Sequence, residues 1–127
     1  MNGLPEDVSR FVTQFMESVE QLEVLLLLRR SPGRAWSAGE VARELYSHPT
    51  SVIQRLQLLL GQGLLREHGQ GFFQYAPRSA ELDRTVGALA ELYRERRVAI
   101  ITLIASKPLE NVKAFADAFR IRKKKED

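Results

Sequence analysis

The residues best suited to chemistry lie in one short segment, and the chemistry that they suggest is hydrogen bonding. Wound as a helix at about 100° per residue, positions 49–60 place leucines beside Val52 on one side, while the other side is largely neutral and polar. That outward side comprises Thr50, Ser51, Gln54, Gln57 and Leu58, and Arg55 and Ile53 lie on its two edges. Glutamine pairs with adenine N6 and N7, serine and threonine bond base edges or phosphate, and arginine reaches guanine or phosphate. The pattern is therefore typical of a helix that reads DNA bases.

Cationic side chains for binding the DNA backbone are scarce in the same region. Arg55 is the single cation of this segment, although affinity for phosphates comes mainly from lysine and arginine. The glycine-rich stretch that follows supplies no cation at neutral pH, and we expect its His68 and Gln70, with Arg66, to approach the backbone or the minor groove. The other candidates for backbone contact are Arg34, Arg43, Arg78 and the basic tail at 122–125.

Catalytic and metal-binding chemistry has little support in the sequence. The chain has no cysteine, which excludes disulfide bonds, thiolate metal sites and a cysteine nucleophile. No glycine-rich phosphate loop follows a strand, no His, Asp and Glu residues have metal-ligand spacing, and no Ser–His–Asp set stands out. We therefore predict that the protein is not an enzyme and needs no cofactor and no metal.

The composition is that of an ordinary globular protein with a single domain at 1–127. The chain has 127 residues, of which 44% are apolar and 28% charged, so it can bury a core without disulfides. Its net charge is +3, a mild basic balance that permits nucleic-acid binding. The N-terminus lacks the basic and apolar regions of a secretory signal, and no apolar run reaches the roughly 18 residues of a membrane helix. We expect a cytoplasmic protein without a membrane partner.

Periodicity and capping signals predict four helices in the first half of the chain, the second of which is either a separate helix or the continuation of a bent first helix. Ser18 and Ser37 are each followed three positions later by a glutamine or glutamate, the signature of a capping box. Pro49 suits the first turn of a helix, because its missing N–H would be unpaired there in any case. The predicted helices cover positions 4–16, 18–30, 37–45 and 49–60.

A hairpin and further helices are predicted in the second half. Two β-like runs, 64–67 and 72–76, are joined by a turn whose glycines supply positive φ angles. Beyond Pro77, an apolar stripe at helical spacing begins at Leu82. The β-branched run at 98–105 fits an extension of that helix or a buried strand, and we favour the helix. The residues that define the two stripes are Leu82, Val86, Leu89, Tyr93, Ile100 and Ile104, then Val112, Phe115, Ala116 and Phe119 in a last helix.

The order of helix, short helix, tight turn, helix and glycine-tipped hairpin resembles the winged helix-turn-helix of bacterial MarR-like regulators. The matching pattern is S-x-x-E-V-A-x-x-L, then P-T-S-V, L-x-x-L and G-L-L. Its residues are Ser37–Ala42, Leu45, His48–Val52, Leu56, Leu59 and Gly63–Leu65. The resemblance implies a fold that is mainly α with a small β-hairpin wing. It further implies a winged helix-turn-helix core at 19–77 and flanking helices at 1–17 and 79–127 that serve in dimerisation.

The function implied by the resemblance is that of a transcriptional regulator, a homodimer that binds specific sequences of double-stranded DNA. The residues that we predict to contact DNA are Thr50, Ser51, Gln54, Arg55, Gln57, Arg66, His68 and Gln70. A second hypothesis is a winged helix that binds a regulatory protein or a component of the transcription machinery. The apolar side chains Ile53 and Leu58 beside the polar face, and the uncharged turn of the hairpin, motivate this alternative.

Overall fold

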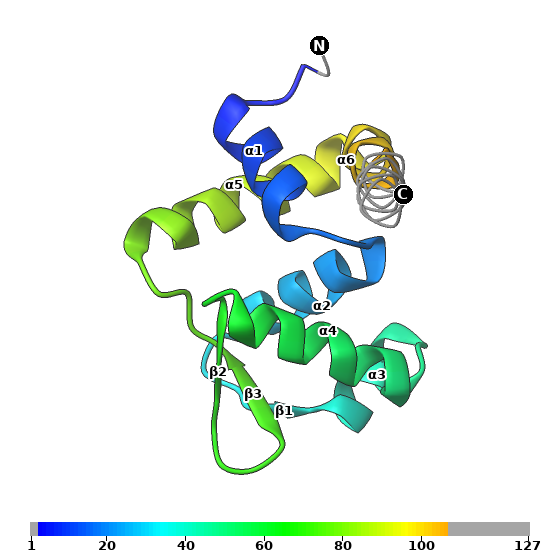
Figure 1. The fold of residues 1–127 in the computed structure, drawn as a ribbon, viewed down its shortest axis with the longest axis vertical. Coiled ribbons are helices and arrows are strands. Elements are labelled where there is room, and N and C mark those ends of the chain that lie inside the picture. Colours follow the sequence, from blue (N-terminus) through cyan, green and yellow to red (C-terminus); the bar gives the residue numbers. More distant parts are fainter. Residues whose placement is uncertain (1–2, 107–127) are drawn as a thin grey trace, which may run out of the picture.

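The computed structural model describes residues 3–106 as six helices and one three-stranded sheet (Figure 1). The helices are α1 (Glu6–Phe15), α2 (Val19–Arg30), α3 (Ala38–Leu45), α4 (Pro49–Gly61), α5 (Ala80–Glu95) and α6 (Arg97–Ala105). The strands are β1 (Trp36–Ser37), β2 (Leu65–Glu67) and β3 (Phe72–Tyr75). The predicted last helix and the basic tail lie outside the described residues. Within the described part, no helix has the length and apolarity that crossing a membrane requires.

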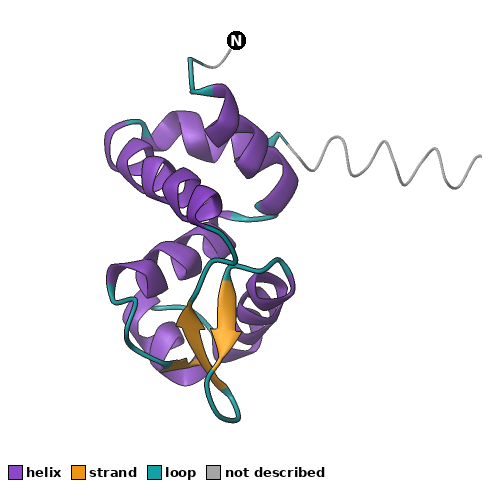
Figure 2. Ribbon diagram, turned by 90° about the vertical axis from the view of Figure 1, so that its left-hand side faces the viewer, coloured by secondary structure: helices purple, strands orange, loops and turns teal. Residues whose placement is uncertain are grey.

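Helix α2 lies at the centre of the molecule, between two layers. Helices α1, α5 and α6 form one layer, and α3, α4 and the sheet form the other (Figures 1 and 2). Leu22, Leu25 and Leu28 on α2 are fully buried, as expected for a helix whose leucines cover more than one face. One hydrophobic cluster continues through α2 from Val8 on α1 to Leu59 on α4. The flanking helices and the helix-turn-helix therefore share a core.

Helix starts follow the predicted capping signals, with one variation. At α3, the Ser37 hydroxyl accepts from the Glu40 backbone N–H at 3.2 Å, and the Glu40 carboxylate accepts from the Ser37 N–H at 2.9 Å, which completes the predicted box. At α2, the Ser18 hydroxyl accepts from the Gln21 N–H, but the Gln21 side chain accepts from the N–H of Glu17. Pro49 occupies the first turn of α4, as predicted.

The sheet is antiparallel with the order β1-β3-β2, so the hairpin of β2 and β3 receives a third short strand from the segment before α3. Trp36 pairs with Phe73 and is buried at the base of the hairpin. The side chains of β3 alternate, since Phe73 and Tyr75 are buried whereas Phe72 is exposed. Gly69 and Gly71 both have positive φ and close the hairpin.

The chain after the hairpin forms two helices, where the sequence predicted a single helix extended by the run at 98–105. The favoured helix at 98–105 is confirmed as α6, but Arg96 leaves helical geometry at φ −131° and ψ 50° and separates it from α5. Backbone bonding continues across this corner, because the Arg96 N–H donates to Leu92 and its carbonyl accepts from Ile100. Residue spacing does not detect such a corner, since Ile100 and Ile104 are buried on the new axis as well.

Candidate nucleic-acid interface

Helix α4 presents the two faces that its sequence predicts. Val52, Leu56 and Leu59 are fully buried and hold the helix against the core. Thr50, Gln54 and Gln57 are exposed on the opposite side. Figure 1 shows that α4 and the hairpin belong to the same half of the molecule, whereas α1 and α6 belong to the other. An exposed row of neutral donors and acceptors therefore lies at the helix-turn-helix end, where it is available to an external partner.

Ser51 was predicted on the outward face, but in the structure its side chain is partly buried and faces α2. Arg55 also faces the protein. The Ser51 hydroxyl lies 3.1 Å from the Glu20 carboxylate and 3.1 Å from the His48 carbonyl, and its single proton is shared between these two acceptors. The Arg55 Nε donates to the other carboxylate oxygen of Glu20 at 3.0 Å. The Ser47 hydroxyl also donates to Glu20. The reason is the packing of α2 along this flank of α4, which a helical wheel drawn for α4 alone does not contain.

Glu20 is a residue of this candidate surface that the sequence interpretation missed. Burial alone would raise the pKa of its carboxyl, but hydrogen bonds from two serines and an arginine, together with the arginine's charge, hold the pKa below its ordinary value of 4.5. The carboxylate is therefore charged at neutral pH and balances the guanidinium. A signal was available, because Ser51 and Arg55 are four positions apart and so lie on the same flank of the helix, and Ser47 comes four positions before Ser51.

A pair of amide side chains, one buried and one partly buried, fixes the other end of α4. Gln21 is fully buried, and its Nε2 donates to the Phe15 carbonyl at 2.8 Å and to the Gln62 side chain at 3.0 Å. The Gln62 amide also donates to the Phe15 carbonyl, at 2.8 Å. The end of α1, the start of α2 and the end of α4 thus meet in one hydrogen-bonded cluster, so α4 is tied to the flanking layer.

The hairpin residues predicted to approach DNA are all exposed. Arg66, His68 and Gln70 lie on β2 and in the turn that follows. The turn is closed by a bond from the His68 N–H to the Phe72 carbonyl at 2.8 Å, and the Gly71 N–H donates to the Glu67 carboxylate at 3.3 Å. The acid of Glu67 at the base of the turn offsets the charge of its neighbour Arg66.

Of the other predicted cations, the structure places Arg34 in contact with the protein itself. Its guanidinium lies 3.5 Å from the ring centroid of Trp36, and its Nη2 is 3.6 Å from the Glu40 carboxylate. Arg43 and Arg78 are exposed. The described part of the interface therefore combines a neutral helix face with a small number of separated cations.

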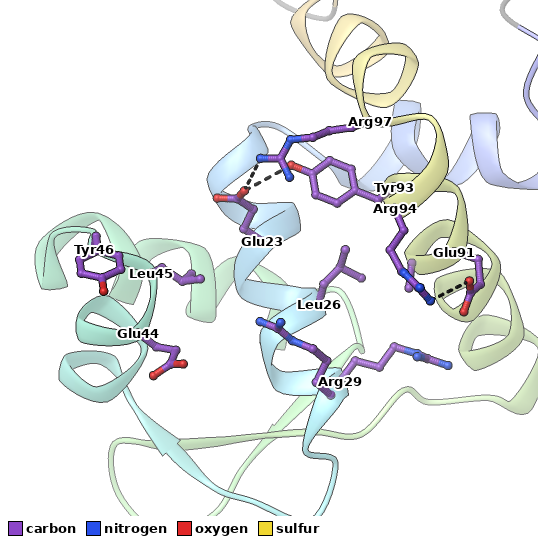
Figure 3. A pocket seen from close by; sticks show the side chains of 12 residues that line it. Glu23, Leu26, Arg29, Glu44, Leu45, Tyr46, Glu91, Tyr93, Arg94 and Arg97 are labelled. Atoms are coloured by element: carbon purple, nitrogen blue, oxygen red, sulfur yellow. Dashed lines mark hydrogen bonds and ion pairs between the residues drawn. The ribbon is translucent and has the colours of Figure 1, made fainter.

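A separate cavity of about 780 Å³ lies between α2, the end of α3 and α5 (Figure 3). Four of its seven charged side chains are paired, because Glu23 accepts from Tyr93 at 3.3 Å and from Arg97 at 3.2 Å, and Arg94 contacts Glu91. Tyr46 at its edge is 98% exposed and adopts left-handed geometry with φ 54°. Among the described residues, no group of three or more His, Asp or Glu side chains is arranged to hold a metal ion.

Comparison with known proteins supports the fold. No sequence profile of a protein family matches the chain, and no curated protein matches it by sequence. The crystal structure of a MarR family transcriptional regulator from Streptomyces coelicolor superposes on 94% of this chain and 84% of its own, with a TM-score of 0.54 and 19% sequence identity. This similarity, with the observed helices and sheet, confirms the predicted winged helix-turn-helix fold with flanking helices.

Proposed function

We propose that the protein is a sequence-specific, DNA-binding transcriptional regulator that acts as a homodimer and has no catalytic activity. The observation that carries the proposal is the exposed row of Thr50, Gln54 and Gln57 on the second helix of a helix-turn-helix. In this motif the second helix enters the major groove, and neutral amide and hydroxyl groups pair with base edges there. The similar structure of a MarR family transcriptional regulator supports the same assignment.

The proposal divides the predicted DNA-contacting residues by their surroundings. Thr50, Gln54 and Gln57 contact base edges, because these side chains are exposed. Ser51 and Arg55 lie at the edge of this exposed face, where their side chains bond to the Glu20 carboxylate. The wing residues Arg66, His68 and Gln70 approach the backbone or the minor groove.

Homodimerisation is part of the proposal because α6 has an exposed apolar side. Val98 is 77% exposed on a helix whose other residues are mostly aliphatic. A helix that is apolar around its whole circumference favours a buried position. A second copy that covers α6 would place two recognition helices on two half-sites and so double each contact with DNA.

A second candidate function is binding of a regulatory or transcription-machinery protein through the same surface. Two observations favour it: Ile53 and Leu58 are only partly buried beside the polar row, and the charge of Arg55 is balanced within the protein. Protein interfaces accept such neutral, partly apolar surfaces more readily than DNA does.

Selection of duplexes from a random-sequence pool by the purified full-length protein tests the first function against the second. We expect an enriched motif with two-fold symmetry and an affinity that falls as salt is raised. If no motif is enriched at low salt, and the protein instead retains one stoichiometric protein partner after nuclease treatment, the DNA-binding proposal is wrong.

A further inference from the structure

One carboxylate holds three successive positions along the flank of the recognition helix and the turn before it. Glu20 on α2 accepts from Ser47 and Ser51 at one oxygen and from Arg55 at the other. Ser51 and Arg55 lie one helical turn apart on α4, and Ser47 lies in the turn before the helix. Glu20 therefore adds to the core contacts that fix the rotation of α4 about its axis, and it sets the direction of the only cation of α4.

The pair of Glu20 and Arg55 is sheltered from solvent, so its attraction is only partly screened. The side chains are 24% and 29% exposed, respectively. A DNA phosphate that attracted Arg55 would have to leave the carboxylate without its cation, and breaking a partly buried pair is costly. Arg55 is therefore poorly available for phosphates while Glu20 is charged.

Whether Arg55 can contact DNA phosphates affects how strongly the protein binds DNA of any sequence. General affinity for any duplex comes from cations on phosphates, whereas discrimination comes from hydrogen bonds to base edges. On α4, the base-edge candidates Thr50, Gln54 and Gln57 are exposed, while Arg55 is engaged. This arrangement weakens general binding and leaves base recognition intact.

We propose that Glu20 is a specificity-determining positioning residue, which withholds Arg55 from DNA phosphates and helps to set the rotation of α4 that directs the polar row at the bases. The inference rests on the proposed DNA-binding function. It assigns to an acidic residue on another helix the control of how strongly the protein binds DNA of unrelated sequence.

The substitution Glu20→Gln tests the inference, because it removes the charge and keeps the size of the side chain. Each new phosphate contact adds about 0.9 to the slope of log affinity against log salt, equivalent to about 3.5-fold between 50 and 200 mM. We expect the variant to bind a random-sequence duplex with a slope steeper by this amount per subunit. Because the same phosphate contact strengthens binding to both duplexes, a fall in the ratio of affinities for the enriched and the random duplex reports the second role of Glu20, the rotation of α4.

Three further variants isolate the pair. Glu17→Gln changes the net charge equally at an exposed site one turn away and should leave the slope unchanged. Arg55→Gln alone should also leave it unchanged, because Arg55 is already engaged by Glu20. The double variant Glu20→Gln, Arg55→Gln should return to the wild-type slope, which a merely structural effect of Glu20 would not produce.

An unchanged slope in Glu20→Gln would overturn the inference, and so would a lower slope in Arg55→Gln alone. The slope of Arg55→Gln can overturn the inference even if Glu20→Gln does not fold. Failure of the proposed function is seen separately in the wild type, as absence of an enriched duplex. If the wild type binds no duplex but Glu20→Gln gains binding that depends on Arg55, the role of Glu20 stands and the function is wrong; if neither binds, both are wrong.

Discussion

The polar residues of α4 differ in their partners, and the partners decide what each residue can do. Ser51 and Arg55 are engaged by Glu20, so their hydrogen-bonding capacity is directed into the protein. Gln54 and Gln57 are exposed one turn apart on the opposite flank. Chemical type alone does not separate these residues, because all four are side chains that proteins use to contact DNA.

Replacement of Gln54 tests base recognition at a single position. We expect Gln54→Ala to cost about 1–3 kcal/mol with the enriched duplex and to relax the preference at one base pair, because a bidentate pair is lost. Binding to duplexes with single-base changes measures both effects. Gln14→Ala, an exposed glutamine on α1, is the matched control and should change neither. Equal losses across all base positions would contradict the assignment.

The pH dependence of stability tests the charge state of Glu20. Its pKa is lower in the folded protein than the ordinary 4.5, so the paired carboxylate stabilises the fold above that value. The contribution is lost as the pH falls through 4.5 and below. We expect urea midpoints of the wild type and Glu20→Gln to differ at neutral pH and to converge in acid. A difference that is independent of pH would contradict this charge state.

At the scale of elements, local patterns predict most of the fold. Ser37 with Glu40, Pro49 and the paired glycines of the hairpin define starts and turns through their immediate neighbours, and these predictions are confirmed. The exposed row on α4 follows from helical spacing and is found as predicted.

What the patterns did not predict depends on contacts between distant segments. The orientation of Ser51 depends on Glu20, which is 31 positions away in the chain. The corner at Arg96 lies where the guanidinium of that residue donates to the carbonyl of Gly3, 93 positions away. Neither partner can be predicted from spacing within one element. The sequence therefore predicted the exposed residues of the candidate site, but it did not predict that Ser51 and Arg55 bond to Glu20.

The amide cluster of Gln21 and Gln62 makes a prediction for the link between α1, α2 and α4. Gln21→Leu keeps the volume but removes bonds to Phe15, Gln62 and Glu17. We expect a loss of about 1–3 kcal/mol in the free energy of unfolding, because buried groups lose their partners. Urea unfolding measures the loss, and the dependence of the unfolding free energy on urea concentration should stay the same. Gln14→Leu on the exposed face of α1 is the control, and an equal effect of both would contradict the link.

At the scale of the whole molecule, the core joins the flanking layer to the helix-turn-helix through α2. Helix α1 contacts α5 and α6, while the amide cluster fixes its end to α4. Because α4 and the flanking helices share these contacts, the position of α4 relative to the flanking helices is fixed. In a homodimer, the spacing of the two recognition helices would then follow from how α6 meets its copy.

A charge on the exposed side of α6 tests the dimer. We expect Val98→Glu to weaken self-association at least about tenfold, because a buried valine contributes about 1.5–3 kcal/mol and a carboxylate adds a desolvation cost. Sedimentation equilibrium measures the change, and affinity for the enriched duplex should fall with it. Ser31→Glu, at the exposed end of α2, is the control. Unaltered self-association in Val98→Glu would rule out this side of α6 as the interface.

The position of Trp36 gives the protein an intrinsic optical probe. It is the single tryptophan of the chain, buried where β1 pairs with β3, and the guanidinium of Arg34 lies over its ring. Its emission therefore arises from one known place at the base of the hairpin, without background from a second indole. Time-resolved fluorescence can thus follow the hairpin as it meets a partner, in the unlabelled and unmodified chain.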